Sequence, residues 1–291
     1  MISTKWYTDK QIGFYAIGAK AIDHYNKNII ERREQVSHTP KEDYSGIIET
    51  LNDKGYCRIE NFFNHQTLDK LQSEFDTLLK LNKHTKLVQG GNHTQIVQPY
   101  LNTNTAFEIA TDSRIVDIAT TFYSCLPALG TCNLRQSKPN NSPAMGTCMF
   151  HRDFNSPAKF LKFFVYLDDV GLNNGPFTYV ETSNRRMPRD PHWESQHRWS
   201  DKQIEEIYGK GSIKHLTANK GDLLIGLTTG FHKGQKIQEG SRTMLTINWV
   251  IHPEIEDKML HREASRFHVQ KEKVNDLEDW KRPVADFLIK V

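Results

Sequence analysis

Three residues from two distant segments of the chain could together bind a metal ion. His151 and Asp153 stand two positions apart, and His232 follows in a separate segment. Residues i and i+2 of a β-strand point to the same face, so His151 and Asp153 can hold one ion together. A histidine from a second strand would complete a 2-His-1-carboxylate face. Three coordination positions would stay open, which is typical of non-haem Fe(II) oxygenases.

An isolated His-x-Asp motif is weak evidence for a metal site, but the surrounding sequence strengthens this evidence. The motif ends an apolar segment, and His232 lies just after another one. Arg242 follows His232 by ten positions, at the start of a further apolar run. One interpretation makes Arg242 a surface arginine. The alternative points it inward, and then Met244, Thr246 and Asn248 share its face.

Composition favours a soluble protein with reduced thiols. Lys and Arg number 38 and Asp and Glu number 35 in 291 residues, a net charge of +3 that gives no argument for nucleic acid. No apolar run is long enough to cross a bilayer, and the first residues lack the layout of a signal peptide. The four cysteines form no CxxC pair, which argues against a disulfide framework and favours a cytoplasmic location.

Hydrophobic periodicity predicts helices outside a β-rich centre. We expect an N-terminal helical extension over 1–50, a β-rich domain over 51–252 and a helical tail over 253–291. A strand and turn over 55–63 should precede a helix capped by Asn64, and a second helix should cover 112–125. The expected strands are Thr131–Ser137, Gly146–Asp153, Phe160–Leu167, Phe177–Glu181, Asp222–Leu227 and Arg242–Ile251.

The strand pattern stops between Ser183 and Asn219. We interpret 183–219 as an insertion over one end of the β-structure, where substrate-selecting loops are usual. A short helix with a Ser200-x-x-Gln203 capping box should lie within it.

The ordered motifs resemble the phytanoyl-CoA dioxygenase family of Fe(II)/2-oxoglutarate-dependent oxygenases. The resemblance covers roughly residues 50–252. It implies a mainly β fold with flanking helices, a double-stranded β-helix (jelly-roll, cupin-like) barrel. It also implies that the three ligands bind Fe(II) and that Arg242 binds the distal carboxylate of 2-oxoglutarate. The motifs that carry it are His151-Arg152-Asp153, Phe163–Val170, Asn174-Gly175-Pro176, His232 and Arg242.

Two departures from the family pattern concern loops near the site. Val180–Arg185 stands where relatives often have Pro-Gly-Ser-His, which predicts a remodelled loop. Gly234 stands two positions after the distal histidine, where relatives carry a hydroxyl residue. One cosubstrate contact is then lost or supplied elsewhere.

The apolar strand 160–167 contains a lysine that needs an explanation. Lys162 shares a face with Phe164 and Tyr166. Lys162 either snorkels out of the sheet or points inward, where it would bind 2-oxoglutarate or an acidic substrate group. Phe164 would form an apolar wall beside the cosubstrate. Two further residues are candidates for polar lining, Asn133 and Arg135.

We interpret the remaining histidines and the basic run as peripheral. His192, His197, His215 and His252 lie in the insertion or beyond the barrel strands. The run Arg185–Arg189 is either a solvated loop or a site for a phosphate or carboxylate of the substrate.

The residues and the resemblance together predict an Fe(II)/2-oxoglutarate-dependent dioxygenase. With O2 it would hydroxylate a small molecule and release succinate and carbon dioxide. Related halogenases replace the carboxylate ligand by a small residue, so Asp153 favours hydroxylation. The alternatives are a cupin-like metalloenzyme that does not use 2-oxoglutarate and an inactive barrel that serves as a binding module.

Overall fold

The structure is a computed structural model, which describes residues 6–7, 27, 38–81, 87–90, 93–153, 161–188, 198–250 and 271–285. The expected N-terminal helix around residues 12–17 and most of the expected helical tail lie outside the described residues. So do His192, His197, Arg189 and His252. Among the described residues, none of the helices has the length and hydropathy that a membrane span requires.

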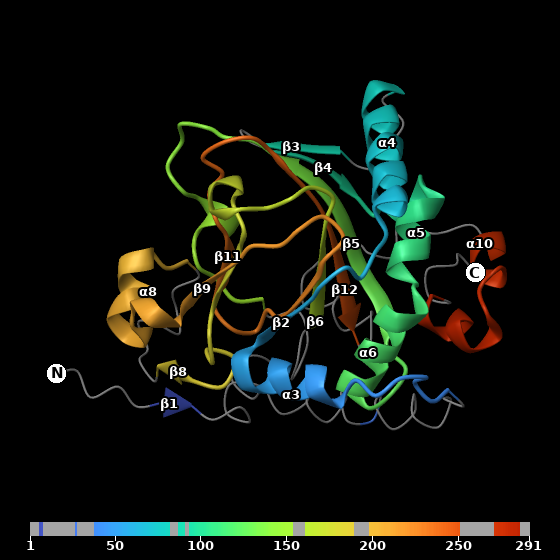
Figure 1. The fold of residues 1–291 in the computed structure, drawn as a ribbon, viewed down its shortest axis with the longest axis horizontal. Helices are drawn as coiled ribbons and strands as arrows, with labels where there is room; N and C mark the ends of the chain where they lie inside the picture. The colour runs from blue at the N-terminus through green and yellow to red at the C-terminus, as the bar shows by residue number, and fades with distance from the viewer. Residues whose placement is uncertain are drawn as a thin grey trace.

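A large antiparallel sheet forms the centre of the molecule (Figure 1). The long strand β12 lies in its middle, paired with β5 on one side and β6 on the other. The sheet order is β2 (Tyr56–Ile59), β10 (Leu223–Leu227), β6 (Leu161–Tyr166), β12 (Arg242–Val250), β5 (Ala128–Ser137), β4 (His93–Val97) and β3 (Leu87–Gly90).

Alternation along these strands gives the sheet two different faces. On β12, the side chains of Leu245, Ile247 and Trp249 are fully buried in the main hydrophobic core. The intervening Met244 and Thr246 point to the opposite face, because successive side chains of a strand alternate. One face is therefore apolar and packed, and the other is available for a site.

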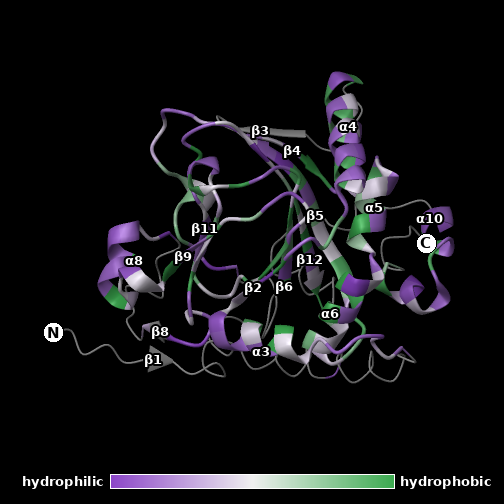
Figure 2. Ribbon diagram, in the orientation of Figure 1, coloured by the Kyte–Doolittle hydropathy of each residue, from purple (hydrophilic) through white to green (hydrophobic). Residues whose placement is uncertain are grey.

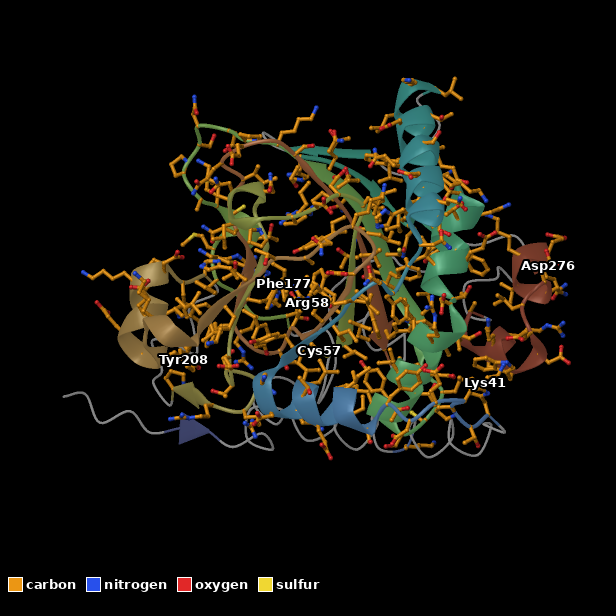
Figure 3. The ribbon with its side chains drawn as sticks, in the orientation of Figure 1. Lys41, Cys57, Arg58, Phe177, Tyr208 and Asp276 are labelled. Atoms are coloured by element: carbon orange, nitrogen blue, oxygen red, sulfur yellow. The ribbon has the colours of Figure 1, made fainter. Side chains whose placement is uncertain are left out.

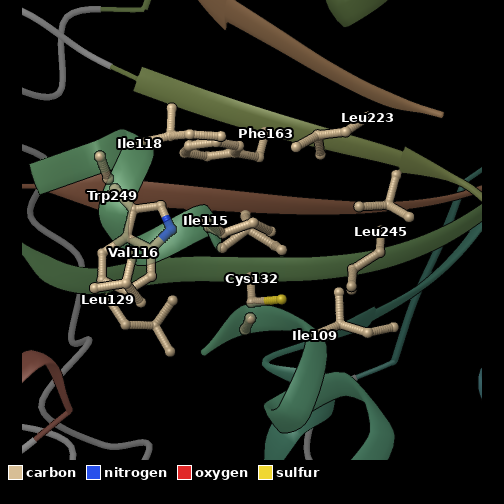
Figure 4. Close-up of a cluster of buried hydrophobic side chains, with 14 of the residues drawn as sticks. Ile109, Ile115, Val116, Ile118, Leu129, Cys132, Phe163, Leu223, Leu245 and Trp249 are labelled. Carbon is tan, nitrogen blue, oxygen red and sulfur yellow. The ribbon is translucent and has the colours of Figure 1, made fainter. Parts of the chain in front are cut away.

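Helices cover the apolar face of the large sheet (Figure 1). Asn64 caps α4 as expected, since its Oδ1 accepts the Thr67 N–H at 2.8 Å. Ile115 and Ile118 of α6 pack near Phe163 and Trp249 of the sheet (Figure 4). Burying each such side chain contributes about 1.5–3 kcal/mol. The helices of this layer are α3 (Ser45–Lys54), α4 (His65–Leu81), α5 (Asn104–Ala110) and α6 (Ser113–Tyr123).

The helices α3, α4 and α8 (Asp201–Tyr208) carry hydrophilic and hydrophobic residues side by side (Figure 2). This pattern is typical of helices with one buried stripe. In α8 the buried residue is Ile204, and Ser200 and Gln203 form the predicted capping box. Lys233 fixes α8 to the β-structure through an ion pair with Asp201 at 2.6 Å.

A small sheet faces the cavity side of the large one. Its order is β11 (His232–Gly234), β7 (Phe177–Val180) and β9 (Ile213–Leu216). Phe177 of β7 lies in the interior (Figure 3), with its ring centroid 4.2 Å from that of Phe164 on β6. The Tyr166 hydroxyl also accepts the Phe177 N–H at 2.8 Å. Two packed antiparallel sheets with helices outside are the predicted fold class.

Two expectations about strands were wrong. Gly146–Asp153 does not form a regular strand: Gly146–Cys148 is a 3-10 turn, and isolated bridges follow. Phe150 pairs with Trp199 and the adjacent His151 pairs with His232, so no continuous ladder can form. Within 183–219, strand β9 belongs to the small sheet. The sequence pattern did not predict β9 because it contains the polar residues Lys214 and His215, which an edge strand tolerates.

The sequence reading also missed β3, β4 and α5, which lie between the two helices that it expected. The segment His93–Val97 reads as polar, yet it pairs with β5 over five residues. Its Gln95 is buried although it is polar.

Two glycines of α3 form a test of this packing. Gly55 ends α3 with φ 89°, in the left-handed region, and a Cβ there would overlap the Tyr179 hydroxyl. We expect Gly55→Ala to lower the free energy of unfolding by about 2 kcal/mol or more, because strain and overlap add. Gly46→Ala is the control, since nothing lies within 4 Å of its Cβ. It should leave stability unchanged or raise it by up to about 1 kcal/mol.

Urea denaturation of both variants measures the difference. Equal stabilities of the two variants would contradict the packing of the α3 end against the small sheet.

Candidate metal centre

His151 and His232 face each other across an antiparallel bridge. The His151 N–H donates to the His232 carbonyl at 2.9 Å, and the His232 N–H donates to the His151 carbonyl at 2.9 Å. Directly opposed residues of an antiparallel pair place their side chains on the same face. The two imidazole centroids are accordingly 4.3 Å apart. The backbone pairing thus fixes the spacing of the two rings.

Asp153 is held beside the histidines by its own backbone. Its N–H donates to the Thr228 carbonyl at 2.7 Å, in the segment that leads to His232. One ligand atom from each of the three residues lies within 4.8 Å of the other two. The structure therefore brings together the three residues that the sequence singled out.

Both imidazoles have the tautomer that a metal requires. The Nδ1 of His151 lies 2.9 Å from the Met149 carbonyl, and that of His232 lies 3.0 Å from the Gly230 carbonyl. A carbonyl only accepts, so each Nδ1 must carry the proton and each Nε2 keeps a lone pair. Such carbonyl contacts orient histidine ligands in known metal sites.

Burial keeps the two histidines neutral. Burial and, to a smaller extent, the neighbouring His151 lower the pKa of His232 to about 3. Burial also lowers the pKa of His151, against the opposing effect of Asp153. Burial alone would raise the pKa of Asp153, but Lys162 and the histidines together bring it well below its usual range. Two neutral imidazoles and a carboxylate are the donor set that suits Fe(II).

Lys162 points inward rather than out of the sheet. Its Nζ lies 2.6 Å from Asp153 Oδ2, and its side chain is only 15% exposed. The hydrogen bond orients the carboxylate and partly neutralises it. Lys162 therefore acts on a proposed metal ligand, and its predicted contact with 2-oxoglutarate remains a prediction.

The cavity between the two sheets measures about 610 Å³. This volume is in the range of sites that bind small molecules. Both histidines open into it, and Phe164 forms an apolar wall with Phe177. The lining also includes Asn133, Arg135, Lys162 and Arg242.

Arg242 is buried at one end of this cavity, with 6% of its surface exposed. It donates through Nη1 to the Gly175 carbonyl, and among the described residues its buried Nε has no hydrogen-bond partner. Burial lowers its pKa. An orphaned donor on a buried cation fits an anionic ligand, because such a group is costly unless it is paired.

Two glycines shape the surroundings of this guanidinium. Gly175 has φ 74°, and a Cβ there would lie 2.5 Å from the Gln235 carbonyl oxygen, so only glycine presents this carbonyl to Arg242. A Cβ at Gly234 would lie 3.6 Å from Nη2 of Arg242. The hydroxyl that relatives carry at this position would be beside the guanidinium.

The peripheral residues lie apart from the metal site where the structure describes them. His215 bonds Thr178 Oγ1 at 3.1 Å and is not part of the cluster. Arg185 donates to the Asp53 carboxylate at 2.8 Å. Phe177 and Gln95, which also line the cavity, were not singled out from the sequence. For Phe177 the alternation of its strand was the available signal.

The fold and the site define the class of protein, a β-sandwich metalloprotein with a 2-His-1-carboxylate cluster. The sequence matches the phytanoyl-CoA dioxygenase (PhyH) family over residues 51–243. This match covers well over half of the chain, and the chain belongs to that family. Among curated proteins, no sequence matches.

Solved structures confirm the predicted double-stranded β-helix fold. EctD from S. alaskensis with bound Fe is 16% identical to this chain, with a TM-score of 0.58. The match covers 74% of this chain and 78% of the EctD chain. The epimerase SnoN, in complex with Fe3+, alpha ketoglutarate and nogalamycin RO, is 17% identical with a TM-score of 0.56, covering 71% and 82%. The carbocyclase SnoK is 13% identical with a TM-score of 0.55, covering 77% and 92%.

Removing a histidine ligand should abolish tight metal binding. We expect His151→Ala or His232→Ala to weaken Fe(II) binding by at least about a hundredfold, since loss of a mere outer partner of a ligand already costs ten- to a hundredfold. Anaerobic titration with Fe(II) measures the affinity. His215→Ala is the control, a described histidine outside the cluster, and should bind Fe(II) as the wild type does. Unchanged Fe(II) affinity in both His151→Ala and His232→Ala would contradict the assignment of these residues as metal ligands.

Proposed function

We propose that the protein is an Fe(II)/2-oxoglutarate-dependent dioxygenase that hydroxylates a small molecule. The observation that carries the proposal is a cavity lined by His151, His232 and the buried Arg242, in which both histidines belong to the three-residue cluster with Asp153. The family and the solved neighbours, whose descriptions include iron and alpha ketoglutarate (2-oxoglutarate), support the same class.

The residues fit this pair of cofactors. His151, Asp153 and His232 would hold the iron, and Arg242 would bind the distal carboxylate of 2-oxoglutarate through a planar fork of donors. When bound, the pair supplies oxidising chemistry in which O2 converts 2-oxoglutarate to succinate and carbon dioxide while the substrate is oxidised.

The other residues of the cavity position and shield this chemistry. The carbonyls of Met149 and Gly230 hold both imidazoles in the ligating tautomer. Lys162 holds the carboxylate of Asp153. Phe164 and Phe177 exclude water from one wall, which strengthens every electrostatic interaction inside the cavity.

Hydroxylation is the specific outcome that we propose. Asp153 supplies a third protein ligand, so the position that halogenases give to a halide is occupied by a carboxylate. The neighbours SnoN and SnoK are described as an epimerase and a carbocyclase, so the fold alone does not select the outcome. None of the four cysteines, all of which are described, is in a disulfide, which supports the proposed cytoplasmic location.

The main rival keeps the metal and the barrel but not the cosubstrate, and Arg242 distinguishes the two. We expect Arg242→Met to weaken 2-oxoglutarate binding to the Fe(II) protein roughly a hundredfold or more. Two hydrogen bonds to a charged group contribute about 1.5–3 kcal/mol each. Arg242→Lys should recover part of the affinity, because it keeps the charge but not the fork.

Anaerobic titration gives the affinities, and succinate release in air gives the turnover. Fe(II) binding should be unchanged in both variants, which separates the cosubstrate site from the metal site. Full 2-oxoglutarate turnover by Arg242→Met would overturn the cosubstrate assignment. Fe(II) binding by the wild type without any 2-oxoglutarate binding would leave the rival metalloenzyme, and no Fe(II) binding would leave the inactive barrel.

A further inference from the structure

A chain of polar side chains crosses the cavity wall on strands β4 and β5. The Arg135 Nε donates to Gln95 Oε1 at 2.6 Å, and the Gln95 Nε2 donates to Asn133 Oδ1 at 3.0 Å. Gln95 lies directly opposite Arg135 in the sheet register. Gln95 is 8% exposed, so these contacts replace the water that it loses.

The direction of this chain is fixed by the arginine. A guanidinium has only donors, so Gln95 must turn its oxygen toward Arg135 and its nitrogen toward Asn133. Asn133 must then accept this hydrogen bond through its side-chain oxygen. The Asn133 Nδ2 and the two terminal nitrogens of Arg135 are not used in this chain of hydrogen bonds. Within the described ranges none of these three nitrogens has a hydrogen bond. Both residues line the cavity. Asn133 and Arg135 therefore present N–H donors to the cavity.

The charges of the cavity also do not balance. Lys162, Arg242 and Arg135 carry three positive charges against the one negative charge of Asp153, and Fe(II) together with the dianion 2-oxoglutarate adds none, so about two positive charges remain in excess. Lys162 is paired with the carboxylate of Asp153, and Arg242 has the distal carboxylate of 2-oxoglutarate. Arg135 has only the neutral amide of Gln95. Of the cations on the described sheet face, Arg135 is the one without an anionic partner after both cofactors bind.

Arg135 lies on the strand next to that of Arg242, the residue proposed to bind the cosubstrate. In the register of β5 and β12, Arg242 lies opposite Ser137, and Arg135 lies opposite Met244. Diagonal positions of this kind are about 7–8 Å apart. Two guanidinium groups this close repel each other, and burial and the charge of Arg242 both lower the pKa of Arg135. A second anion between Arg135 and the metal would relieve this repulsion.

We propose that the primary substrate carries a carboxylate or phosphate group, and that Arg135 and Asn133 bind this group with Gln95 as a positioning residue. The proposal rests on the proposed function, because the charge balance assumes bound Fe(II) and 2-oxoglutarate. It assigns substrate selection to the outer β4–β5 part of the large sheet. The basic run Arg185–Arg189, which the sequence offered for the same role, has Arg185 paired with Asp53 instead.

The test measures binding of simple anions to the holoprotein. Wild type saturated with Fe(II) and 2-oxoglutarate under nitrogen is titrated with inorganic phosphate and with acetate, at constant ionic strength in chloride. Arg135→Met should weaken the binding of the preferred anion at least about tenfold, because a charged fork is lost. Arg135→Lys should recover part of it, since it retains the charge. Arg185→Met is the matched control and should bind the anion as the wild type does.

The affinity for 2-oxoglutarate is measured in the same variants. It should stay within about twofold of the wild type in Arg135→Met while the anion affinity falls. Loss of 2-oxoglutarate binding in this variant would place Arg135 in the cosubstrate site and overturn the substrate inference alone. So would a wild type that binds 2-oxoglutarate and neither anion, or an anion affinity that Arg135→Met leaves unchanged. Failure of the wild type to bind 2-oxoglutarate would instead overturn the proposed function, and the inference with it.

Discussion

The reciprocal backbone hydrogen bonds between His151 and His232 are the constraint on which the site depends. They fix two imidazoles from distant segments at the same level and on the same face. A single bridge is enough, because the backbone is also held on both sides of His151. The Phe150 N–H donates to the Trp199 carbonyl, and the Asp153 N–H donates to the Thr228 carbonyl. Rigidity of the main chain, rather than side-chain packing, thus presets the ligand geometry before a metal arrives.

Alternation in the large sheet connects this geometry to folding. One set of residues on β5, β6 and β12 forms the apolar core with helices α4, α5 and α6. The alternate set, which includes Lys162 and Arg242, lines the cavity. A shift of one residue in the register would exchange the two sets, so burial of the core selects the register that also assembles the site.

The closeness of His151, Asp153 and His232 and the inward position of Arg242 could be predicted, because metal-ligating residue types and an arginine at the start of an apolar strand are visible in the sequence. The strands with strong apolar patterns, such as β6, β10 and β12, were predicted for the same reason. Gln95 and β4 could not be, since their burial depends on pairing with β5 and on the demand of Arg135 for an acceptor. The HxD segment was expected to be a strand, but its neighbours pair with different partners, and periodicity does not report such switches.

The distribution of charge in the cavity links stability to function. Full burial of Arg242 and partial burial of Lys162 and Arg135 on one sheet face oppose folding, because Asp153 is the one carboxylate among the described residues that pairs with any of them. A more apolar face would fold more readily and bind nothing anionic. Anions that enter the cavity regain the electrostatic energy that burial of these cations costs, so cosubstrate and substrate should both stabilise the folded state. The same imbalance of charge that opposes folding is therefore the basis of the proposed preference for acidic ligands.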